Sequence, residues 1–166
     1  LTETWGYVRT AEMHLRWERP HQAYSVAQEG LSHDPLDGRL NEIYARALYL
    51  SDETQKALAA CRPSVFKNEI PPELMFLESE IEFQRGNIKE AIERQSLALN
   101  VDPGNYGQWR TLLDWTEEHR NIEEHFELCE KFVALFPADA VAHGFHASAL
   151  HKLKPTESLN ECIDEY

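Results

Sequence analysis

Two short stretches of the chain carry the clearest helix pattern: Gly86-Asn87-Ile88-Lys89-Glu90-Ala91-Ile92-Glu93 and, after four residues, Ala98-Leu99-Asn100-Val101-Asp102-Pro103. Asn87, with Glu90 three residues later, can cap the exposed N–H groups at the start of a helix. Pro103 ends the pattern because proline cannot continue the hydrogen-bond ladder. The two stretches therefore predict one helix with both of its ends marked.

The same pattern returns along the chain with a period of 34 residues. Residues 121–127 repeat residues 87–93, and small residues and prolines recur at the same interval or twice it. Two helices approach closely only where the side chains at their crossing are small. We therefore expect these positions to be helix contacts, with Ala45 facing Ala57 and Ser64 allowing the next hairpin to stack. The four columns are Ala11, Ala45 and Ser79; Ala23, Ala57 and Ala91; Gly30, Ser64 and Ala98; Pro35, Pro103 and Pro137.

Each period reads as two helices. Apolar residues at spacings of three and four mark helices over residues 40–50, 72–85 and 109–119, and strand-like alternation is absent from the sequence. Asp52 and Asn121 can cap the second helices of their periods as Asn87 does. Pro20 and Pro155 stand where a first helical turn tolerates proline. The sequence thus predicts an all-α chain of helical hairpins.

This arrangement resembles the tetratricopeptide repeat (TPR) family, in residues 86–103 and in the Trp-x-x-Leu opening at Trp109 and Leu112. The resemblance implies an α-solenoid of stacked antiparallel hairpins in a right-handed superhelix, with about four and a half repeats. One repeat domain would cover residues 1–166, with units near 4–37, 38–71, 72–105 and 106–139 and a partial unit over 140–166. The partial unit lacks a polar closing helix, so we expect the natural chain to continue.

Two units depart from the family pattern. The three small positions of the fourth unit hold Leu113, His125 and Phe132, so its hairpin must be splayed, rotated or differently packed. His125 is expected to be a neutral core histidine. In the third unit Glu78 occupies a position that the family makes apolar, which leaves the register of that first helix open by one residue.

Composition excludes several classes of protein. The chain carries 29 acidic and 16 basic residues, for a net charge of −13. Such a balance opposes binding to phosphate backbones, so no nucleic acid partner is expected. Three cysteines do not make a disulfide scaffold, and no apolar run is long enough to insert into a membrane. Free cysteines favour a reducing compartment such as the cytoplasm, but the localisation stays unknown.

No catalytic, cofactor or metal motif accompanies the repeats. The chain has no phosphate-binding loop, nucleophile elbow, His-Glu-x-x-His pair or Cys-x-x-Cys pair. We therefore expect no enzyme activity in this segment and no cofactor. His143, His146 and His151 share a helix face but lack the further donors that a transition metal needs. Cys61 and Cys129 lie two periods apart, too far for a disulfide, and are expected to be buried thiols.

The TPR resemblance implies a concave groove lined by first-helix side chains. Leu15, Tyr49 and Phe83 fall on one column and would form an apolar track, which suits a peptide with a few apolar anchors. The alternative is that the aromatic side chains pack against neighbouring first helices. The groove positions carried over from the family are Arg39, Glu42, Arg46, Tyr49, Phe76, Glu80, Phe83, Arg110, Asp114 and Glu117.

One specialised groove is not expected. Chaperone-binding members of the family grip a terminal carboxylate with Lys, Asn and Arg, whereas the matching positions here are Val8, Glu12, Ile43, Glu73 and Leu77. We therefore predict no binding to acidic C-terminal chaperone peptides. The acidic run of the fourth unit reads as a solvated face, with a docking patch for a basic segment as the alternative; it comprises Glu117, Glu118, Glu123, Glu124, Glu127 and Glu130.

Three functions stay open on this basis. The first is a non-catalytic scaffold that binds a peptide or partner protein in the groove. The second is an accessory domain that recruits or assembles parts of a larger enzyme or secretion complex. The third is a homo-oligomer formed through the C-terminal edge around Phe145 and Leu150.

Overall fold

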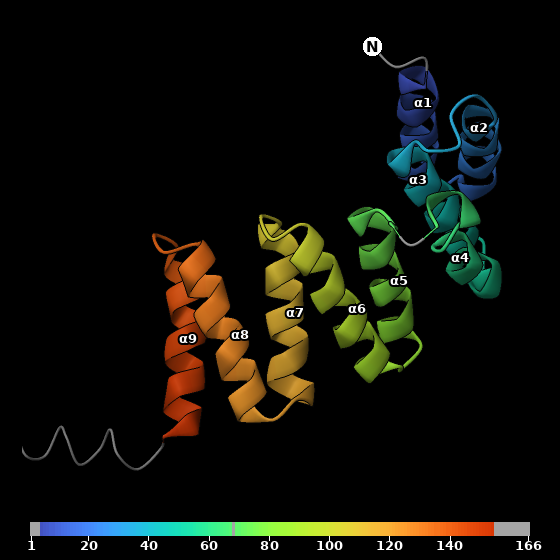
Figure 1. Ribbon diagram of the computed structural model, residues 1–166. Helices are drawn as coiled ribbons and strands as arrows, with labels where there is room; N and C mark the ends of the chain where they lie inside the picture. The colour runs from blue at the N-terminus through green and yellow to red at the C-terminus, as the bar shows by residue number, and fades with distance from the viewer. Residues whose placement is uncertain (1–3, 68, 155–166) are drawn as a thin grey trace, which may run out of the picture. The chain divides into compact units, whose positions relative to one another are not determined.

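The described chain, residues 4–67 and 69–154 of a computed structural model, is all-helical. Its helices form antiparallel pairs, each joined by a short turn (Figure 1). In chain order the α-helices are α1 (Trp5–Arg16), α2 (Pro20–His33), α3 (Gly38–Leu50), α4 (Thr54–Ala60), α5 (Pro72–Gln84), α6 (Ile88–Val101), α7 (Tyr106–His119), α8 (Ile122–Leu135) and α9 (Ala140–Leu153), with a 3-10 turn, η1 (Ser64–Phe66), after α4.

The helices form two compact units, divided between Val101 and Asp102. Unit 1 holds α1 to α6, and unit 2 holds α7 to α9. The first helices of successive pairs begin at residues 5, 38, 72, 106 and 140, which are 33 or 34 residues apart. The period found in the sequence is therefore the spacing of the helix pairs.

Most helix ends lie where the sequence signals predict them. Pro20 and Pro72 occupy the first turns of α2 and α5, where the missing N–H costs nothing. The side chain of Asn121 accepts a hydrogen bond of 2.8 Å from the backbone N–H of Glu124 at the start of α8. The second helices α2, α6 and α8 each stop two residues before a proline. Pro155 lies outside the described residues.

Small residues form the helix contacts of unit 1, as expected. Ala23, Ala57 and Ala91 are all fully buried, and Ala45 and Ala57 belong to one core cluster. Because an alanine methyl group is short, the paired backbones lie close enough for neighbouring apolar residues to fill the space between them. The core of unit 1 contains two buried clusters, one around Leu40 and one reaching Ile81, and the partly buried Tyr44 packs against both.

Gly30 is the closest of these contacts. A Cβ atom added to Gly30 would lie 2.8 Å from Cβ of Tyr7 in α1 and 2.7 Å from Cδ1 of Leu40 in α3. No side chain fits at those distances without moving a neighbouring helix. Gly30 therefore sets the approach of three helices.

The second helix pair departs from the expectation. Ser64 was expected to be a stacking contact, but α4 ends at Ala60 and Ser64 is exposed in η1. Pro63 explains the difference, because a residue before proline disfavours the helical conformation and Arg62 is that residue. The expected cap by Asp52 is also wrong, since Asp52 has a left-handed φ of 62° and α4 begins two residues later without a side-chain cap.

Unit 2 accommodates large residues at the small positions. Leu113 and Phe132 are fully buried, and the ring of Phe132 contacts Trp109, with 6.0 Å between the ring centroids. The backbones of α7 and α8 accordingly approach each other less closely along their length than those of α5 and α6. The hairpin is therefore held open by an aromatic core.

His125 is buried in this hairpin at 1% exposure, as the sequence suggests. Its Nδ1 lies 2.9 Å from Oγ1 of Thr116, and its Nε2 lies 3.5 Å from Sγ of Cys129. Burial lowers the pKa of His125 below its usual value, while Glu117 acts to raise it and Lys152 to lower it. Burial also raises the pKa of the Cys129 thiol to about 11. His125 and Cys129 are therefore both neutral, and their side chains fill the core of this hairpin.

Unit 2 should lose stability as the pH falls below neutrality. Because the folded pKa of His125 is lowered, the unfolded chain binds the proton more readily between that pKa and the usual value of about 6.5. Its contribution is complete above that window and is lost as the pH falls through it. We expect a His125→Gln variant, followed by urea unfolding at pH 7.5 and 5.5, to lose less stability on acidification than the wild type.

A matched control for this prediction is His151→Gln, at an exposed position of α9. This variant should keep the wild-type dependence on pH. An equal response of wild type and His125→Gln would contradict the assignment of the pH dependence to His125.

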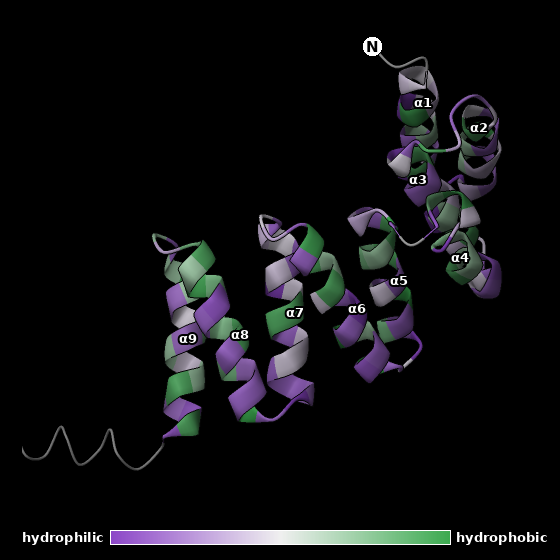
Figure 2. Ribbon diagram, in the orientation of Figure 1, coloured by the Kyte–Doolittle hydropathy of each residue, from purple (hydrophilic) through white to green (hydrophobic). Residues whose placement is uncertain are grey.

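Hydrophobic and hydrophilic residues mix along each helix (Figure 2). Within residues 4–67 and 69–154, no helix has the length and apolar character needed to cross a membrane.

Cys61 and Cys129 are both buried free thiols, as predicted, and burial raises the pKa of Cys61 to about 12.

Candidate partner-binding face

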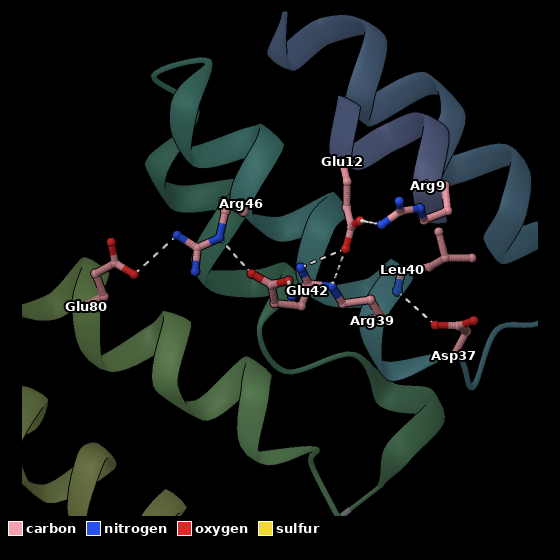
Figure 3. Close-up of polar contacts among 8 residues, drawn as sticks. All are labelled: Arg9, Glu12, Asp37, Arg39, Leu40, Glu42, Arg46 and Glu80. Atoms are coloured by element: carbon pink, nitrogen blue, oxygen red, sulfur yellow. Dashed lines mark hydrogen bonds and ion pairs between the residues drawn. The ribbon is translucent and has the colours of Figure 1, made fainter. Parts of the chain in front are cut away.

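The first helices of unit 1 lie beside one another, α1 next to α3 and α3 next to α5. Their side chains on one side carry a row of alternating charges, which we call the charge ladder (Figure 3). It consists of Arg9, Glu12, Arg39, Glu42, Arg46 and Glu80.

The charge ladder joins the three helices by ion pairs. Nη2 of Arg39 lies 2.9 Å from Oε1 of Glu12 in α1, and Nη1 of Arg39 lies 2.7 Å from Oε2 of Glu42 (Figure 3). Arg46 bonds Glu42 with Nε at 2.6 Å from Oε1, and Nη1 lies 3.3 Å from Oε2 of Glu80 in α5. Three arginines and three glutamates neutralise one another along the row.

Glu42 is the buried centre of the charge ladder, with 5% of its side chain exposed. A buried carboxylate is costly unless it is paired, and here two guanidinium groups pair it. Burial alone would lower the pKa of Arg46, but its bonds to Glu42 and Glu80 raise the pKa above its usual value. Arg46 therefore stays charged, and its position is fixed by two neighbouring helices.

The aromatic positions of the expected groove differ in access. Phe76 is buried at 7% exposure, so it packs inside unit 1. Tyr49 and Phe83 are partly buried, and Tyr49 packs against the core cluster of α3 and α5. A cavity of about 450 Å³ adjoins Tyr49 between the ends of α3 and α5 and is also lined by Gln84 and Arg85. Leu50, Asp52 and Thr54 complete its lining, which is therefore mixed, with more polar than apolar residues.

The remaining groove positions lie in unit 2. Arg110, Asp114 and Glu117 are exposed and lie on α7 at the three- and four-residue spacing of one helix face. Glu117 is paired with Lys152 of α9, with 2.5 Å between Oε1 and Nζ. These residues form a polar face of unit 2.

The positions that match the chaperone clamp do not form a carboxylate site. Ile43 and Leu77 are 1% exposed, within the core of unit 1. Glu12 is part of the charge ladder, and Glu73 is an exposed acid in the first turn of α5. The carboxylate of a peptide would meet acids and no lysine at these positions.

Sequence reasoning missed two members of the charge ladder, Arg9 and Glu12. Their signal was present, because the three-residue spacing of Arg9 and Glu12 matches that of Arg39 and Glu42.

Among the described residues no three His, Cys, Asp or Glu side chains are grouped to hold a metal ion. His143 instead bonds the carbonyl of Pro137 at 2.9 Å from Nε2, and His146 packs against Phe126.

Comparison with known proteins finds a likeness to solved structures, and this likeness concerns the fold alone. No protein-family profile matches the chain, and no curated protein matches it. A chain from the structure of Naa15/Naa10 bound to HypK-THB has a TM-score of 0.77 and 18% identity over 90% of this chain. The present chain spans only 23% of that protein.

Two smaller solved proteins resemble nearly the whole chain. The MamA RS-1 ArsTM double mutant has a TM-score of 0.61 and 17% identity, covering 100% of this chain and 99% of its own. YrrB, described as a TPR protein with an unusual peptide-binding site, has a TM-score of 0.62 and 10% identity, covering 98% of this chain and 84% of its own. With the 34-residue helix pairs, these likenesses show that the chain has the tetratricopeptide repeat fold, an all-α helical repeat solenoid.

Proposed function

We propose that the chain is a non-catalytic scaffold that binds a peptide segment of a partner protein on the face of unit 1 formed by α1, α3 and α5. The charge ladder is the observation that carries the proposal, because it presents charges of both signs in fixed positions across α1, α3 and α5. Exposed charges of both signs steer a complementary partner and set its register.

The occupant that fits best is an extended or helical peptide with apolar anchors and flanking charges of both signs. Tyr49 and Leu50, the two apolar members of the mixed lining of the cavity, would contact an apolar anchor, and the half-exposed Arg39 and Glu80 would contact the flanking charges. A neutral ladder favours such a mixed peptide over a purely acidic or purely basic one. The solved structure of Naa15/Naa10 bound to HypK-THB and the peptide-binding site ascribed to YrrB support a role in binding a protein or peptide.

The proposed role includes recruitment within a larger assembly, the second function that the sequence left open. A homo-oligomer through the C-terminal edge remains the third. Of that edge, Leu150 is 41% exposed on α9, whereas Phe145 is only partly exposed. The charge ladder favours the first function, because three helices, α1, α3 and α5, together present its charges on one face.

Reversing one charge of the ladder should reduce partner binding. Arg39 has 52% of its side chain exposed, so Arg39→Glu removes a contact for a partner and places a third acid beside Glu12 and Glu42. We expect at least about a tenfold loss of affinity for a partner isolated with the wild-type chain, since a like-charge contact costs a kilocalorie or more. Isothermal titration calorimetry with both proteins measures it.

The matched control is Lys131→Glu, which makes the same change of net charge at an exposed position of α8. This variant should bind the partner as the wild type does. Equal affinity of the Arg39→Glu variant, with the fold intact by circular dichroism, would move the site away from the charge ladder.

A further inference from the structure

A second site lies in unit 1, between the loop after α4 and the helices α5 and α6. It is a cavity of about 240 Å³, smaller than the roughly 300–1,000 Å³ of pockets for whole small molecules. Its size suits the end of one side chain. We call it the Glu78 socket; its lining consists of Arg62, Glu78, Glu82, Glu90, Glu93, Arg94 and Leu97.

Glu78 is the buried group of the socket, with 3% of its side chain exposed. Its Oε1 accepts hydrogen bonds from Nε of Arg62 at 2.7 Å and from Nη2 of the same guanidinium, and forms an ion pair with Arg94, whose Nε lies 3.4 Å away. Its Oε2 is also buried and has no hydrogen-bond donor among the described residues. A buried acceptor without a donor is costly, and because neighbouring atoms cover Oε2, a donor from outside the chain reaches it only when those side chains move aside.

The rim of the socket is acidic. Glu90 and Glu93 are exposed; Glu90 makes no ion pair within the described part of the chain, and Glu93 is 4.0 Å from Lys89. With four glutamates and two arginines, the lining carries a net charge of −2. Since Oε1 of Glu78 already engages both guanidinium groups, an anion would meet carboxylates at the rim. Charge complementarity therefore selects a cation.

Leu97 adds an apolar contact at the rim, where it is 48% exposed. Lysine and arginine side chains lay their methylene stems along such apolar surface while the charged end seeks an acceptor. A metal ion would gain nothing from this leucine. The combination of a buried acceptor, acidic rim and exposed leucine therefore describes a long basic side chain.

We propose that the Glu78 socket receives one lysine or arginine side chain of a partner protein, with the charged end donating to Oε2 of Glu78 and the rim held by Glu90 and Glu93. Glu78 and Glu80 are two residues apart on α5, about 200° around the helix. The socket therefore lies on the other side of α5 from the charge ladder. It is a contact additional to the proposed function and does not depend on it.

The test is a titration of the isotope-labelled chain, followed by backbone amide shifts, with three blocked tripeptides. Ac-Gly-Arg-Gly-NH₂ and Ac-Gly-Lys-Gly-NH₂ carry the proposed group, and Ac-Gly-Cit-Gly-NH₂ carries citrulline, the neutral counterpart of arginine. We expect saturable shifts centred on residues 78, 90, 93 and 97 with Arg or Lys at millimolar concentrations, and at least about fivefold weaker binding with citrulline.

Two charge-matched variants locate the effect. Glu90→Gln/Glu93→Gln should weaken the Arg or Lys tripeptide at least about fivefold, whereas Glu127→Gln/Glu130→Gln, at exposed positions of α8, should not. The proposal is overturned if citrulline binds equally well, if shifts scatter over all acidic surfaces, or if the rim variant binds as the wild type does. A Glu78→Gln variant adds a second check where it folds: it should lose the same shifts without affecting α7 to α9.

Discussion

Replacing Gly30 with alanine should destabilise unit 1 by about 2 kcal/mol. The added Cβ would lie 2.8 Å from Cβ of Tyr7, an atom fixed to the backbone of α1, so one helix must move. Forcing a methyl group into a packed core costs about 1–3 kcal/mol, and here the upper end applies because Tyr7 cannot rotate away. Alanine in a helix returns about 1 kcal/mol, which leaves the balance unfavourable. Denaturant unfolding measures the difference.

The matched control is Gly144→Ala in the interior of α9, where an added Cβ meets nothing within 4 Å. This variant should be unchanged or more stable by up to about 1 kcal/mol, because only the helix propensity acts. A Gly30→Ala protein as stable as the wild type would show that the helices of unit 1 do not meet at Gly30.

Removing the guanidinium of Arg62 should also destabilise unit 1, by about 2–3 kcal/mol. Glu78 would keep only the weaker contact with Arg94, and a buried carboxylate without its partner costs about 3–5 kcal/mol. The expected loss lies at or below the lower end of that range because Arg62 is half exposed and water can reach the vacated position. Urea unfolding of Arg62→Ala measures the loss.

The double variant Arg62→Ala/Glu78→Gln separates pairing from packing. It should recover part of the stability lost in Arg62→Ala, because the glutamine no longer buries a charge. Arg120→Ala is the control, since Arg120 pairs with the half-exposed Glu124 and such surface pairs contribute about 0–1 kcal/mol. Equal effects of Arg62→Ala and Arg120→Ala would mean that Glu78 does not need its partner.

The helix pairs could be predicted from sequence because the period is built from local signals. Small residues, caps and prolines each act within one or two turns, so Ala23, Ala57 and Ala91 could be placed in the core without knowing the structure. The short α4 could have been predicted as well. Arg62-Pro63 is a helix stop, but the period alone suggested a helix that continues to Ser64.

The candidate sites were less accessible to sequence reasoning because they depend on pairs between helices. Glu78 stood out as a charge in an apolar position, but its partner Arg62 lies 16 residues away, beyond the early end of α4. Arg46 and Glu80 are one period apart and could be paired from sequence, whereas the burial of Glu42 between two arginines needs the three-dimensional arrangement. Phe76 shows the opposite case: the family pattern places it in the groove, but in the structure its side chain is buried.

The central claim is that a partner binds where the charge ladder lies. Site-specific photo-crosslinking tests this claim most directly. A photoreactive phenylalanine analogue is placed at Glu80, an exposed member of the ladder, and in a second protein at Lys131 on α8. With the partner of the wild-type chain present, we predict crosslinks from position 80 and none above background from position 131. Crosslinks from position 131 alone, with position 80 silent and both proteins folded, would contradict the account.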